Sequence, residues 1–430
     1  MKRLGFYDPD KKTEGDKKLD DIEKRIEKLE KDLSALQEKE DDVGDARKRQ
    51  LAAKKERMKE AKRKRKETIK RKKEKRLAKE KKRAWYHQNE ILLGVHSTIG
   101  SQLRLDDMSL LNKRWSKIKD KMIESSYGLY SYFNDFLKLN NVENFIIFNG
   151  RISCARPLKV VSENNNVDYT LFDGAVNGMT PYYATNEMFH SIEFEKRNAL
   201  KSYLKYFKIS RELAKEYSYK KINKIPILRD VVFTKNQVKG FIDPKILEIK
   251  KPIISIFVSS DDEYRFLGSD FGKDPIVDQI QSIKKLIRSN LTQKFTFIVK
   301  MHPNQVKSHF SILKKYKDLS KRVMIVFPDN KTDTYSLIDL SSIIINFSSS
   351  IGAEVNYLRK PVVQIGPSKW MGLPTANFVK NAEQAIMIIS ENKYKLMPQR
   401  SSIAYFFNLS SFTIKFSKLL FKYFLTFSLV

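Results

Sequence analysis

The sequence predicts an α/β protein in which two doubly wound blocks follow a basic helical arm. Three features predict it: a charged N-terminal segment almost without aromatic residues, a series of short apolar runs of strand length, and amphipathic stretches between those runs. At 430 residues the chain is long enough for two ordinary domains and an appendage. Its single cysteine, Cys154, allows neither a disulfide framework nor a cysteine metal site, so a cytoplasmic location is expected.

Residues 1–84 are expected to form the arm. The first 83 residues hold 33 Lys and Arg against 20 Asp and Glu. An apolar stripe spaced by three and four residues over 19–36 predicts a coiled-coil seam that could drive self-association. Its members are Leu19, Ile22, Ile26, Leu29, Leu33 and Leu36. Beyond a break near Gly44, residues 54–83 are mostly Lys and Arg, which indicates a solvated helix or flexible arm, with contact to RNA or an anionic membrane as the alternative.

The net charge of +32 indicates anionic partners or surroundings. Phosphate sugars, nucleic acid and anionic lipid head groups all fit, and charge alone does not choose among them. Residues 84–430 still carry 50 Lys and Arg against 31 Asp and Glu, so the basic character is not confined to the arm. This counts against a nucleic-acid partner that binds through the arm alone.

From Trp85 onward the apolar runs predict two α/β blocks, 85–225 and 226–400. Most runs are apolar on both faces, as strands of a parallel sheet covered by helices must be. The predicted strands are 145–150, 168–172, 253–258, 295–299, 323–327, 342–347 and 361–366. A helix over 275–291 is expected to open at Pro275, and the polar, basic segment 216–230 is expected to connect the blocks.

A histidine follows directly after one of these strands, in "FIVKMHPN". In an open parallel sheet, ligands bind beyond the carboxyl ends of the strands, and His302 lies at such an end. Pro303 restricts the backbone before it, which fixes the direction of the imidazole. A histidine there can donate to a phosphate or pass a proton to a leaving group. The alternative is a histidine that only caps the strand end.

Three serines and a glycine follow the next long strand, in "INFSSSIGAEVNYLR". Hydroxyl groups and backbone N–H groups at such a strand-to-helix turn can close around a phosphate. The turn contains Ser348, Ser349, Ser350 and Gly352, and Glu354 falls in the first helical turn, where it could reach a sugar hydroxyl. An ordinary N-cap explains one serine but not three followed by a glycine.

Together with "FIIFNGRISCARPL" (145–158) and "IFVSSDDEY" (256–264), these segments carry a family resemblance. In the same order, over about 95–400, they resemble the bacterial capsule and surface-polysaccharide glycosyltransferases of the GT-B fold. These include Kdo-transferase-like capsule proteins and sialyltransferases with His-Pro and Ser-Ser motifs. The resemblance implies a GT-B-like pair of Rossmann-type domains, of which the N-terminal one looks incomplete.

The resemblance also implies roles for individual residues. His302 would contact the donor phosphate and support departure of the leaving group. Asp173, in "LFDGA", would be the general base, although Phe172 stands where the family motif has a first acidic residue. No metal and no cofactor are expected, and the donor would be a nucleotide sugar, with CMP among the candidate nucleotides. The residues expected to bind it are Lys300, Pro303, Asn304, Ser348, Ser349, Ser350, Gly352, Glu354, Ser259, Ser260, Glu263, Asn149 and Arg151.

The predicted function is metal-independent transfer of a sugar from a nucleotide-activated donor to a growing capsular or surface polysaccharide, or to a lipid-linked acceptor. A nucleic-acid-binding or scaffolding protein that acts through its basic arm is the alternative from another class. A relative of the same fold that epimerises or hydrolyses a nucleotide sugar is a third interpretation.

The C-terminal segment 401–430 is expected to form an amphipathic helix. Residues 406–430 contain no acidic residue, and Lys415, Lys418 and Lys422 would form one basic stripe on a helix. Such a helix suits the inner face of a cell membrane. A final helix that packs back across the first domain is the alternative. A chain ending near Tyr405 should stay folded if the segment is a membrane anchor.

Overall fold

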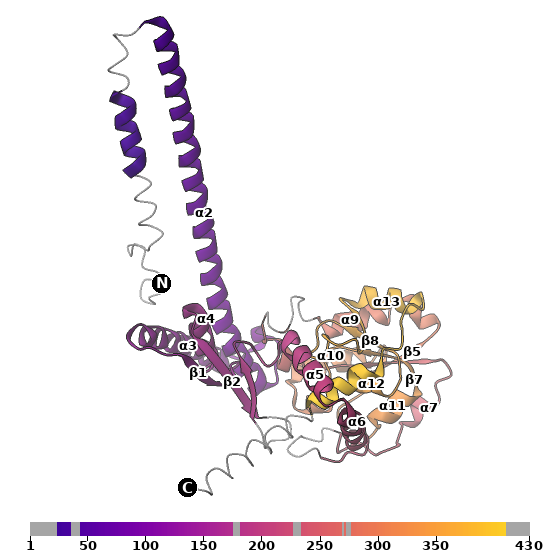
Figure 1. Ribbon diagram of the computed structural model, residues 1–430. Coiled ribbons are helices and arrows are strands. Elements are labelled where there is room, and N and C mark those ends of the chain that lie inside the picture. The colour runs from indigo at the N-terminus through magenta and orange to yellow at the C-terminus, as the bar shows by residue number, and fades with distance from the viewer. Residues whose placement is uncertain are drawn as a thin grey trace. The chain divides into compact units, whose positions relative to one another are not determined.

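The computed structural model describes residues 24–35, 44–174, 181–226, 234–268, 271 and 277–409. The chain divides into two compact units, Met1–Asn89 and Glu90–Val430. Helix α2 (Asp45–Leu103) runs through the boundary, so its last turns belong to the second unit (Figure 1). Among the described helices, none is both long enough and apolar enough to cross a bilayer.

The first unit contains a second helix, residues 24–35, that pairs with the beginning of α2. Ile26 is buried, and Leu29 and Leu33 are half-buried, so the described part of the predicted apolar stripe is the protected face. On its exposed side, Glu30 forms an ion pair with Lys62 of α2. This part of the predicted seam therefore packs within one chain; Leu19, Ile22 and Leu36 lie outside the described residues.

The N-terminal part of the second unit holds a small mixed sheet. Strands β1 (Asn144–Phe148) and β2 (Asp168–Gly174) pair in parallel, and α4 (Arg156–Asn165) connects them. Strand β3 (Pro181–Thr185), which the sequence analysis missed, pairs antiparallel to β2. This sheet has three described strands, fewer than the sheet of a complete Rossmann-type domain. The other helices here are η2 (Met108–Leu110) and α3 (Lys113–Leu139).

The other described strands of the second unit form a parallel sheet of six strands. The strands are β4 (Ile253–Phe257), β5 (Thr296–Lys300), β6 (Met324–Val326), β7 (Ser341–Asn346), β8 (Val362–Ile365) and β9 (Asn377–Val379). Their order is β6-β5-β4-β7-β8-β9, and every pairing is parallel. This is the Rossmann order, and the chain reverses direction across the sheet between β4 and β7. The five strands predicted here are confirmed; β9 was missed because its three residues are only half-buried.

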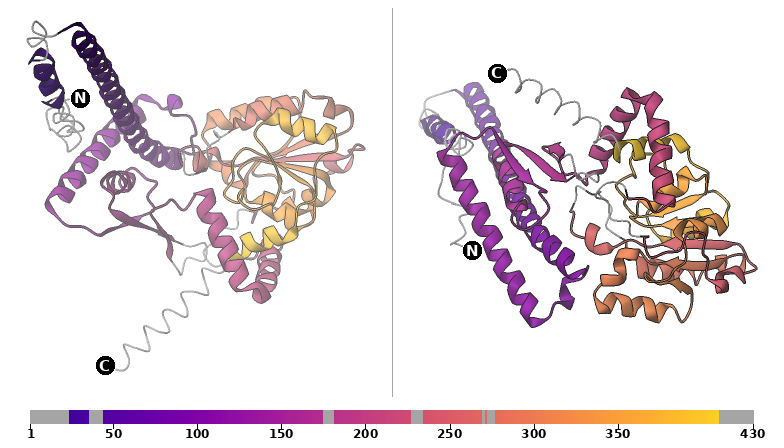
Figure 2. Two further views of the ribbon diagram at one scale, coloured as in Figure 1. Left: turned by 45° about the horizontal axis from the view of Figure 1, so that its top comes forward. Right: turned by 90° about the horizontal axis from the view of Figure 1, so that it is seen from below.

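Helices cover both faces of this sheet (Figure 2). Successive residues of β4 point to opposite sides, so Ile254 and Ile256 enter one core while Ile253 and Phe257 enter the other. The first core is covered by α9 (Gln279–Leu286), α10 (Phe310–Leu319) and α13 (Ala382–Ser390), and the second by α11 (Thr334–Leu340) and α12 (Ile351–Tyr357). Short helical segments are α7 (Pro244–Leu247), α8 (Asp261–Tyr264), η4 (Asn290–Gln293) and η5 (Pro303–Lys307).

Helix α9 begins later than predicted. Its N-cap is Asp278, whose carboxylate accepts a hydrogen bond from Gln281 N at 3.0 Å. An aspartate that satisfies a free N–H group of the first turn is a stronger start signal than a proline three residues upstream. Pro275 itself lies outside the described residues.

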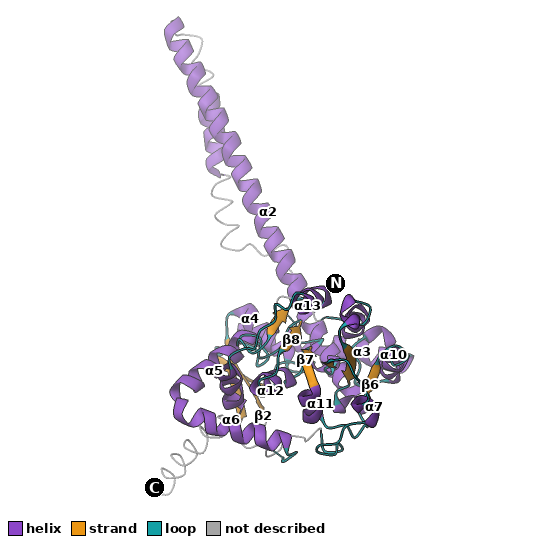
Figure 3. Cartoon of the chain, turned by 90° about the vertical axis from the view of Figure 1, so that its right-hand side faces the viewer, coloured by secondary structure: helices purple, strands orange, loops and turns teal. Residues whose placement is uncertain are grey.

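Helices α5 and α6, from the middle of the chain, share a core with the larger sheet and with the last described helix of the chain. Figure 3 labels both. Helix α5 is Ile192–Lys205 and α6 is Phe207–Ile222, so the first half of the expected connection 216–230 is helical. Ala199 of α5 and Tyr217 of α6 share a core with Phe406, which lies on the helix of residues 399–409.

The end of the described chain is part of this core. Phe406 and Phe407 are 1% and 0% exposed, and Asn408 donates from Nδ2 to Glu195 Oε2 at 3.0 Å. A chain ending near Tyr405 loses these two fully buried rings, so we now expect it to be destabilised. Residues 410–430, with the three lysines of the expected basic stripe, lie outside the described residues.

Candidate functional site

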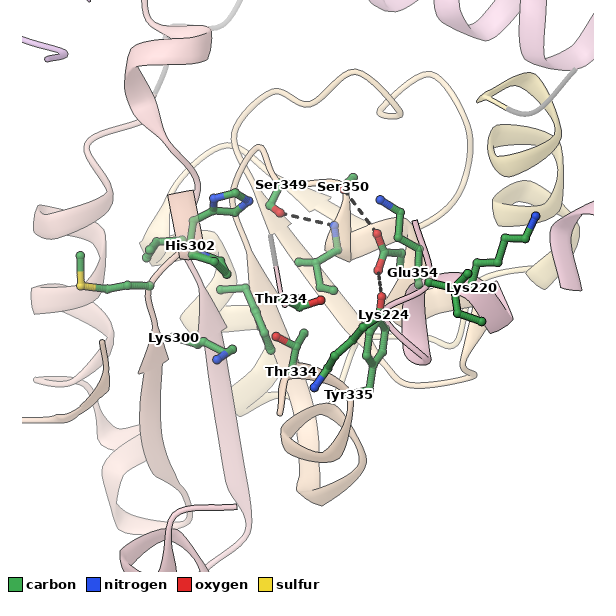
Figure 4. Close-up of a pocket in the computed structure, with 17 residues that line it drawn as sticks. Lys220, Lys224, Thr234, Lys300, His302, Thr334, Tyr335, Ser349, Ser350 and Glu354 are labelled. Atoms are coloured by element: carbon green, nitrogen blue, oxygen red, sulfur yellow. Dashed lines mark hydrogen bonds between the residues drawn. The ribbon is translucent and has the colours of Figure 1, made fainter. Parts of the chain in front are cut away.

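A pocket lies at the carboxyl edge of the larger sheet, where the strand order reverses (Figure 4). In open parallel sheets this is the position at which ligands bind. The ends of β4 and β5, the turn after β7 and the C-terminal end of α6 contribute to its walls. Its lining residues are Lys220, Lys221, Lys224, Ile225, Thr234, Phe257, Val258, Lys300, Met301, His302, Pro303, Thr334, Tyr335, Ser349, Ser350, Ile351 and Glu354.

His302 lies at the strand end, as predicted, and is the N-cap of η5. Its Nδ1 accepts a hydrogen bond from Asn304 N at 3.1 Å, so the neutral ring carries its proton on Nε2. Burial lowers the pKa of His302 to about 4, and Lys300, Arg104 and Lys221 add to this effect. At neutral pH the ring is uncharged, and Nε2–H is a hydrogen-bond donor rather than a source of positive charge.

The turn after β7 presents two of the three predicted serines to the pocket. Ser349 and Ser350 line it, and Ser349 Oγ also accepts from Ile351 N at 3.4 Å. Ser348 does not line it: the side chain is buried and its hydroxyl donates to the Pro367 carbonyl at 2.9 Å. The prediction of three phosphate-facing hydroxyls is corrected to two.

Gly352 does not line the pocket, and the structure gives it a packing role. A Cβ atom at this position would lie 2.4 Å from the Trp370 ring and 2.8 Å from Asn346 Nδ2. Trp370 Nε1 and Asn346 Nδ2 both donate to the Ser349 carbonyl, at 3.2 and 2.8 Å. The glycine therefore allows these two side chains to hold the serine turn from behind.

Glu354 is the acidic side chain among the described lining residues. Its Oε2 accepts from the Tyr335 hydroxyl at 2.7 Å, and its Oε1 accepts from Ser350 Oγ at 3.4 Å. Burial and the neighbouring Glu354 carboxylate raise the pKa of Tyr335 well above its usual value, so the phenol remains a donor. The carboxylate is thus fixed at the pocket wall, where a ligand hydroxyl could donate to it.

Lysines give the pocket its charge, and sequence analysis found one of them. Lys300 was predicted, whereas Lys220, Lys221 and Lys224 come from the end of α6 and the turn after it. The run "KKINK" was the available signal, but it was interpreted as part of a solvated connection. The pKa of Lys300 is lowered to about 8, chiefly by burial; the Asp333 carboxylate opposes this shift and the Lys224 charge adds to it.

Other predicted residues support the pocket from outside its lining. Asn304 provides the N–H group that binds His302. Ser259 is buried and hydrogen-bonded to Gln279 through its N–H, carbonyl and hydroxyl groups, and Ser260 is also buried. Neither serine lines the pocket, so the structure does not bring them to the predicted binding site. The side chain of Glu263 lies outside the described part of the chain.

The sequence also places an acidic cluster, Asp261, Asp262 and Glu263, after β4, where it could rival Asp173 as a source of the general base, and Asp262 has a structural contact. Asp262 is 5% exposed and forms an ion pair with Arg104, with 3.1 Å between Oδ2 and Nη1. Burial raises the pKa of Asp262, and Arg104 opposes the shift. Its carboxylate is therefore engaged by a cation from the helix α2 end.

Three predicted residues gather at the carboxyl end of the small sheet. Asp173 accepts from Asn149 Nδ2 at 2.5 Å, and Asn149 Oδ1 accepts from Arg151 N at 3.1 Å. Arg151 also donates to Ser101 Oγ at 3.4 Å. These residues contact one another but do not line the pocket described above. The proton-accepting role of Asp173 stays a prediction.

Within the described ranges, no group of three or more His, Cys, Asp and Glu side chains is arranged to hold a metal ion. The charged groups at the pocket are chiefly lysines, and lysine ammonium groups are suited to bind phosphate.

No protein-family model and no curated protein matches this chain. Two enzymes of Thermosulfurimonas dismutans are similar in structure. KpsC beta Kdo 2,4 transferase is 14% identical over 61% of this chain and 78% of its own, with a TM-score of 0.39. KpsC beta Kdo 2,7 transferase is 12% identical over 64% and 79%, with a TM-score of 0.38. The wall teichoic acid polymerase TagF is 14% identical over 39% and 40%, with a TM-score of 0.23. These similarities do not assign the chain to a family.

Proposed function

We propose that the protein is a glycosyltransferase that moves a sugar from a nucleotide-activated donor to a growing capsular or surface polysaccharide. One observation carries the proposal: His302, Ser349, Ser350 and the pocket lysines converge on one pocket at the carboxyl edge of a Rossmann-ordered sheet. Such a pocket suits the phosphate of a nucleotide. The motif resemblance to capsule glycosyltransferases supplies the reaction class.

In this proposal the donor phosphate binds between His302 and the serine turn. The Nε2–H group of His302 and the hydroxyl of Ser349 donate to its oxygens, while the Ser350 hydroxyl donates to Glu354. In the transfer step, the bond between the sugar anomeric carbon and the phosphate oxygen breaks, and an acceptor oxygen forms a new bond to that carbon. Hydrogen bonds aimed at the departing phosphate then stabilise the charge that develops on it.

The acceptor hydroxyl must lose its proton during transfer. Asp173 is the proposed base, held by Asn149 at 2.5 Å. Glu354 is proposed to bind a hydroxyl of the donor, because Tyr335 and Ser350 orient its carboxylate at the pocket wall. Lysine ammonium groups are proposed to balance the phosphate charge in place of a metal ion.

The acceptor is proposed to be a polysaccharide or a lipid-linked saccharide, in accordance with the resemblance. Contact of residues 410–430 with the inner face of the membrane belongs to the same proposal, since their Phe, Leu and Lys content suits an interface.

Thermal-shift measurements with CMP, CDP, UDP and GDP test the proposal, because a ligand that binds only the folded state raises Tm. At least one nucleotide should raise Tm in wild type, and the corresponding nucleotide sugar should then be consumed in the presence of a saccharide acceptor. If none of the four shifts Tm and none binds by calorimetry, the proposed function is wrong.

A further inference from the structure

Two lysines and one carboxylate form a buried cluster at one end of the pocket: Lys224, Lys300 and Asp333. Lys300 is 3% exposed and Asp333 is 2% exposed. The Lys224 Nζ atom lies 3.2 Å from Asp333 Oδ1. With both lysines protonated, the cluster carries one positive charge more than it carries negative charge.

Asp333 is already engaged by groups other than Lys300. Its Oδ2 accepts from Ser336 N at 3.1 Å and from Ser336 Oγ at 2.9 Å, as the N-cap of α11. Its Oδ1 pairs with Lys224, which also donates to the Gln237 carbonyl at 2.7 Å. The Asp333 carboxylate therefore pairs with Lys224 and accepts hydrogen bonds at the start of α11, rather than contacting Lys300.

Lys300 has donor capacity left over. An ammonium group has three N–H donors. Among the described residues, Lys300 Nζ makes one hydrogen bond, to the Thr332 carbonyl at 3.2 Å. A buried ammonium group with so few partners costs free energy, and a methionine of similar length would avoid that cost. The arrangement is favourable once an anion from the pocket side binds to it.

This cluster is separate from the end of the pocket where His302 and the serines lie. In Figure 4, Lys300, Lys224 and Thr334 lie at one end, and His302, Ser349 and Ser350 lie at the other. The pocket thus offers two groups of donors, one neutral and one cationic. A ligand with a single phosphate group at the serine turn would leave the cationic end without a partner.

We propose that Lys300 binds a second anionic group of the ligand and that the site selects nucleoside diphosphates over nucleoside monophosphates. The inference rests on the proposed function and narrows its donor to a diphosphate-linked sugar. One phosphate binds at His302 and the serine turn. The oxygens of the other phosphate accept hydrogen bonds from the Lys300 ammonium group. Lys224, held by Asp333, adds positive charge beside it.

Calorimetry on the full chain at pH 7 tests the proposal with two matched ligand pairs, UDP with UMP and CDP with CMP. Lys300→Met removes the ammonium and keeps the length of the side chain. Lys251→Met is the control, because Lys251 also donates to a backbone carbonyl, that of Thr292 at 3.1 Å, but is exposed and lies outside the pocket. Thermal unfolding of each variant verifies that it is folded.

Wild type and the Lys251→Met variant should bind the diphosphate of at least one pair about tenfold or more tighter than its monophosphate, the scale of one charge-assisted hydrogen bond. Lys300→Met should reduce that preference to about twofold or less, with a smaller effect on the monophosphate. Equal binding of monophosphates and diphosphates by wild type overturns this inference and leaves the proposed function in place. An equal loss of affinity for monophosphate and diphosphate in Lys300→Met also overturns this inference and leaves the proposed function in place. Failure of all four nucleotides to bind, together with failure of GDP in the thermal-shift test, overturns both proposals.

Discussion

Arg156 and Glu90 form a fully buried ion pair in the second unit, with 2.5 Å between Nη2 and Oε2 and exposures of 0% and 3%. Arg156 also donates to the carbonyls of Phe266 and Leu267, at 3.3 and 2.9 Å. One guanidinium therefore ties the end of α2 and the start of α4 to the segment that follows α8. Gly268 permits this approach, because a Cβ atom there would lie 2.7 Å from Arg156 Nη2.

Glu90→Gln should destabilise the protein by about 3 kcal/mol, because it leaves the Arg156 charge buried without its counter-charge. Urea denaturation measures the change. Asp135→Asn is the control, since it breaks an exposed pair with Lys138 and should have little effect. A Glu90→Gln variant as stable as the Asp135→Asn variant would show that the pair does not hold these segments together.

His302→Ala should weaken nucleotide binding by about 1–3 kcal/mol while the protein stays folded, because the Nε2–H donor to the phosphate is lost. His309→Ala is the matched control: His309 is also an N-cap, and its Nδ1 accepts from Ser311 N at 3.4 Å, but it does not line the pocket. Calorimetry with the best-binding nucleotide compares the two. Equal affinities in both variants would make His302 a structural cap.

Replacing Ser349 and Ser350 together by alanine should weaken nucleotide binding by about 1–3 kcal/mol, because the phosphate loses the Ser349 donor and Glu354 loses the Ser350 hydroxyl that orients it. Ser348→Ala should leave affinity unchanged and lower stability by about 1 kcal/mol, because its hydroxyl bonds to the Pro367 carbonyl. Calorimetry and denaturation together separate the effects. Loss of affinity in Ser348→Ala alone would contradict the assignment of the two pocket-facing serines.

Stability should depend on pH through Lys300, whose pKa is about 8 in the fold against an ordinary 10.5. Between these values the unfolded chain holds a proton that the folded chain has released, so this residue makes stability rise with pH across that window. Below pH 8 the full cost of burying the ammonium applies. Lys300→Met should be more stable than wild type at pH 7, and the gap should narrow toward pH 10.5.

Denaturation of both proteins in steps from pH 7 to pH 10 measures that gap, with Lys251→Met as the control whose difference from wild type stays constant. A gap between wild type and Lys300→Met that is independent of pH would mean that burial does not shift the titration of Lys300.

Phe407→Ala should destabilise the protein by about 3–5 kcal/mol, because it removes a fully buried ring that lies 5.9 Å from the Tyr206 ring. A chain that ends after Leu409 keeps this ring and should be more stable than one that ends after Tyr405, which loses it. Thermal unfolding of the three variants measures this. If the shortest chain unfolds at the wild-type temperature, residues 406–409 are dispensable for the fold.

The sequence determined five strands of the larger sheet, though not β9, and the location of the pocket. Runs such as 295–299 and 342–347 carry apolar residues on both faces, and a strand buried on both faces requires that pattern. His302 and the serine turn follow two of these strands directly, so the rule for carboxyl ends was enough to place them at one edge. The strands and the residues that follow them are each defined by a short stretch of chain, so the local sequence is enough to predict them.

Tertiary structure decided which side chains face the pocket and which support it. Ser348 and Ser349 are adjacent in sequence, but the Pro367 carbonyl takes the hydroxyl of one and leaves the other at the pocket wall. Lys224 reaches the site because α6 packs on the larger sheet, and Gly352 is needed because Trp370 lies against it. Each outcome depends on a partner distant in sequence, and local patterns carry no information about which distant group will arrive there.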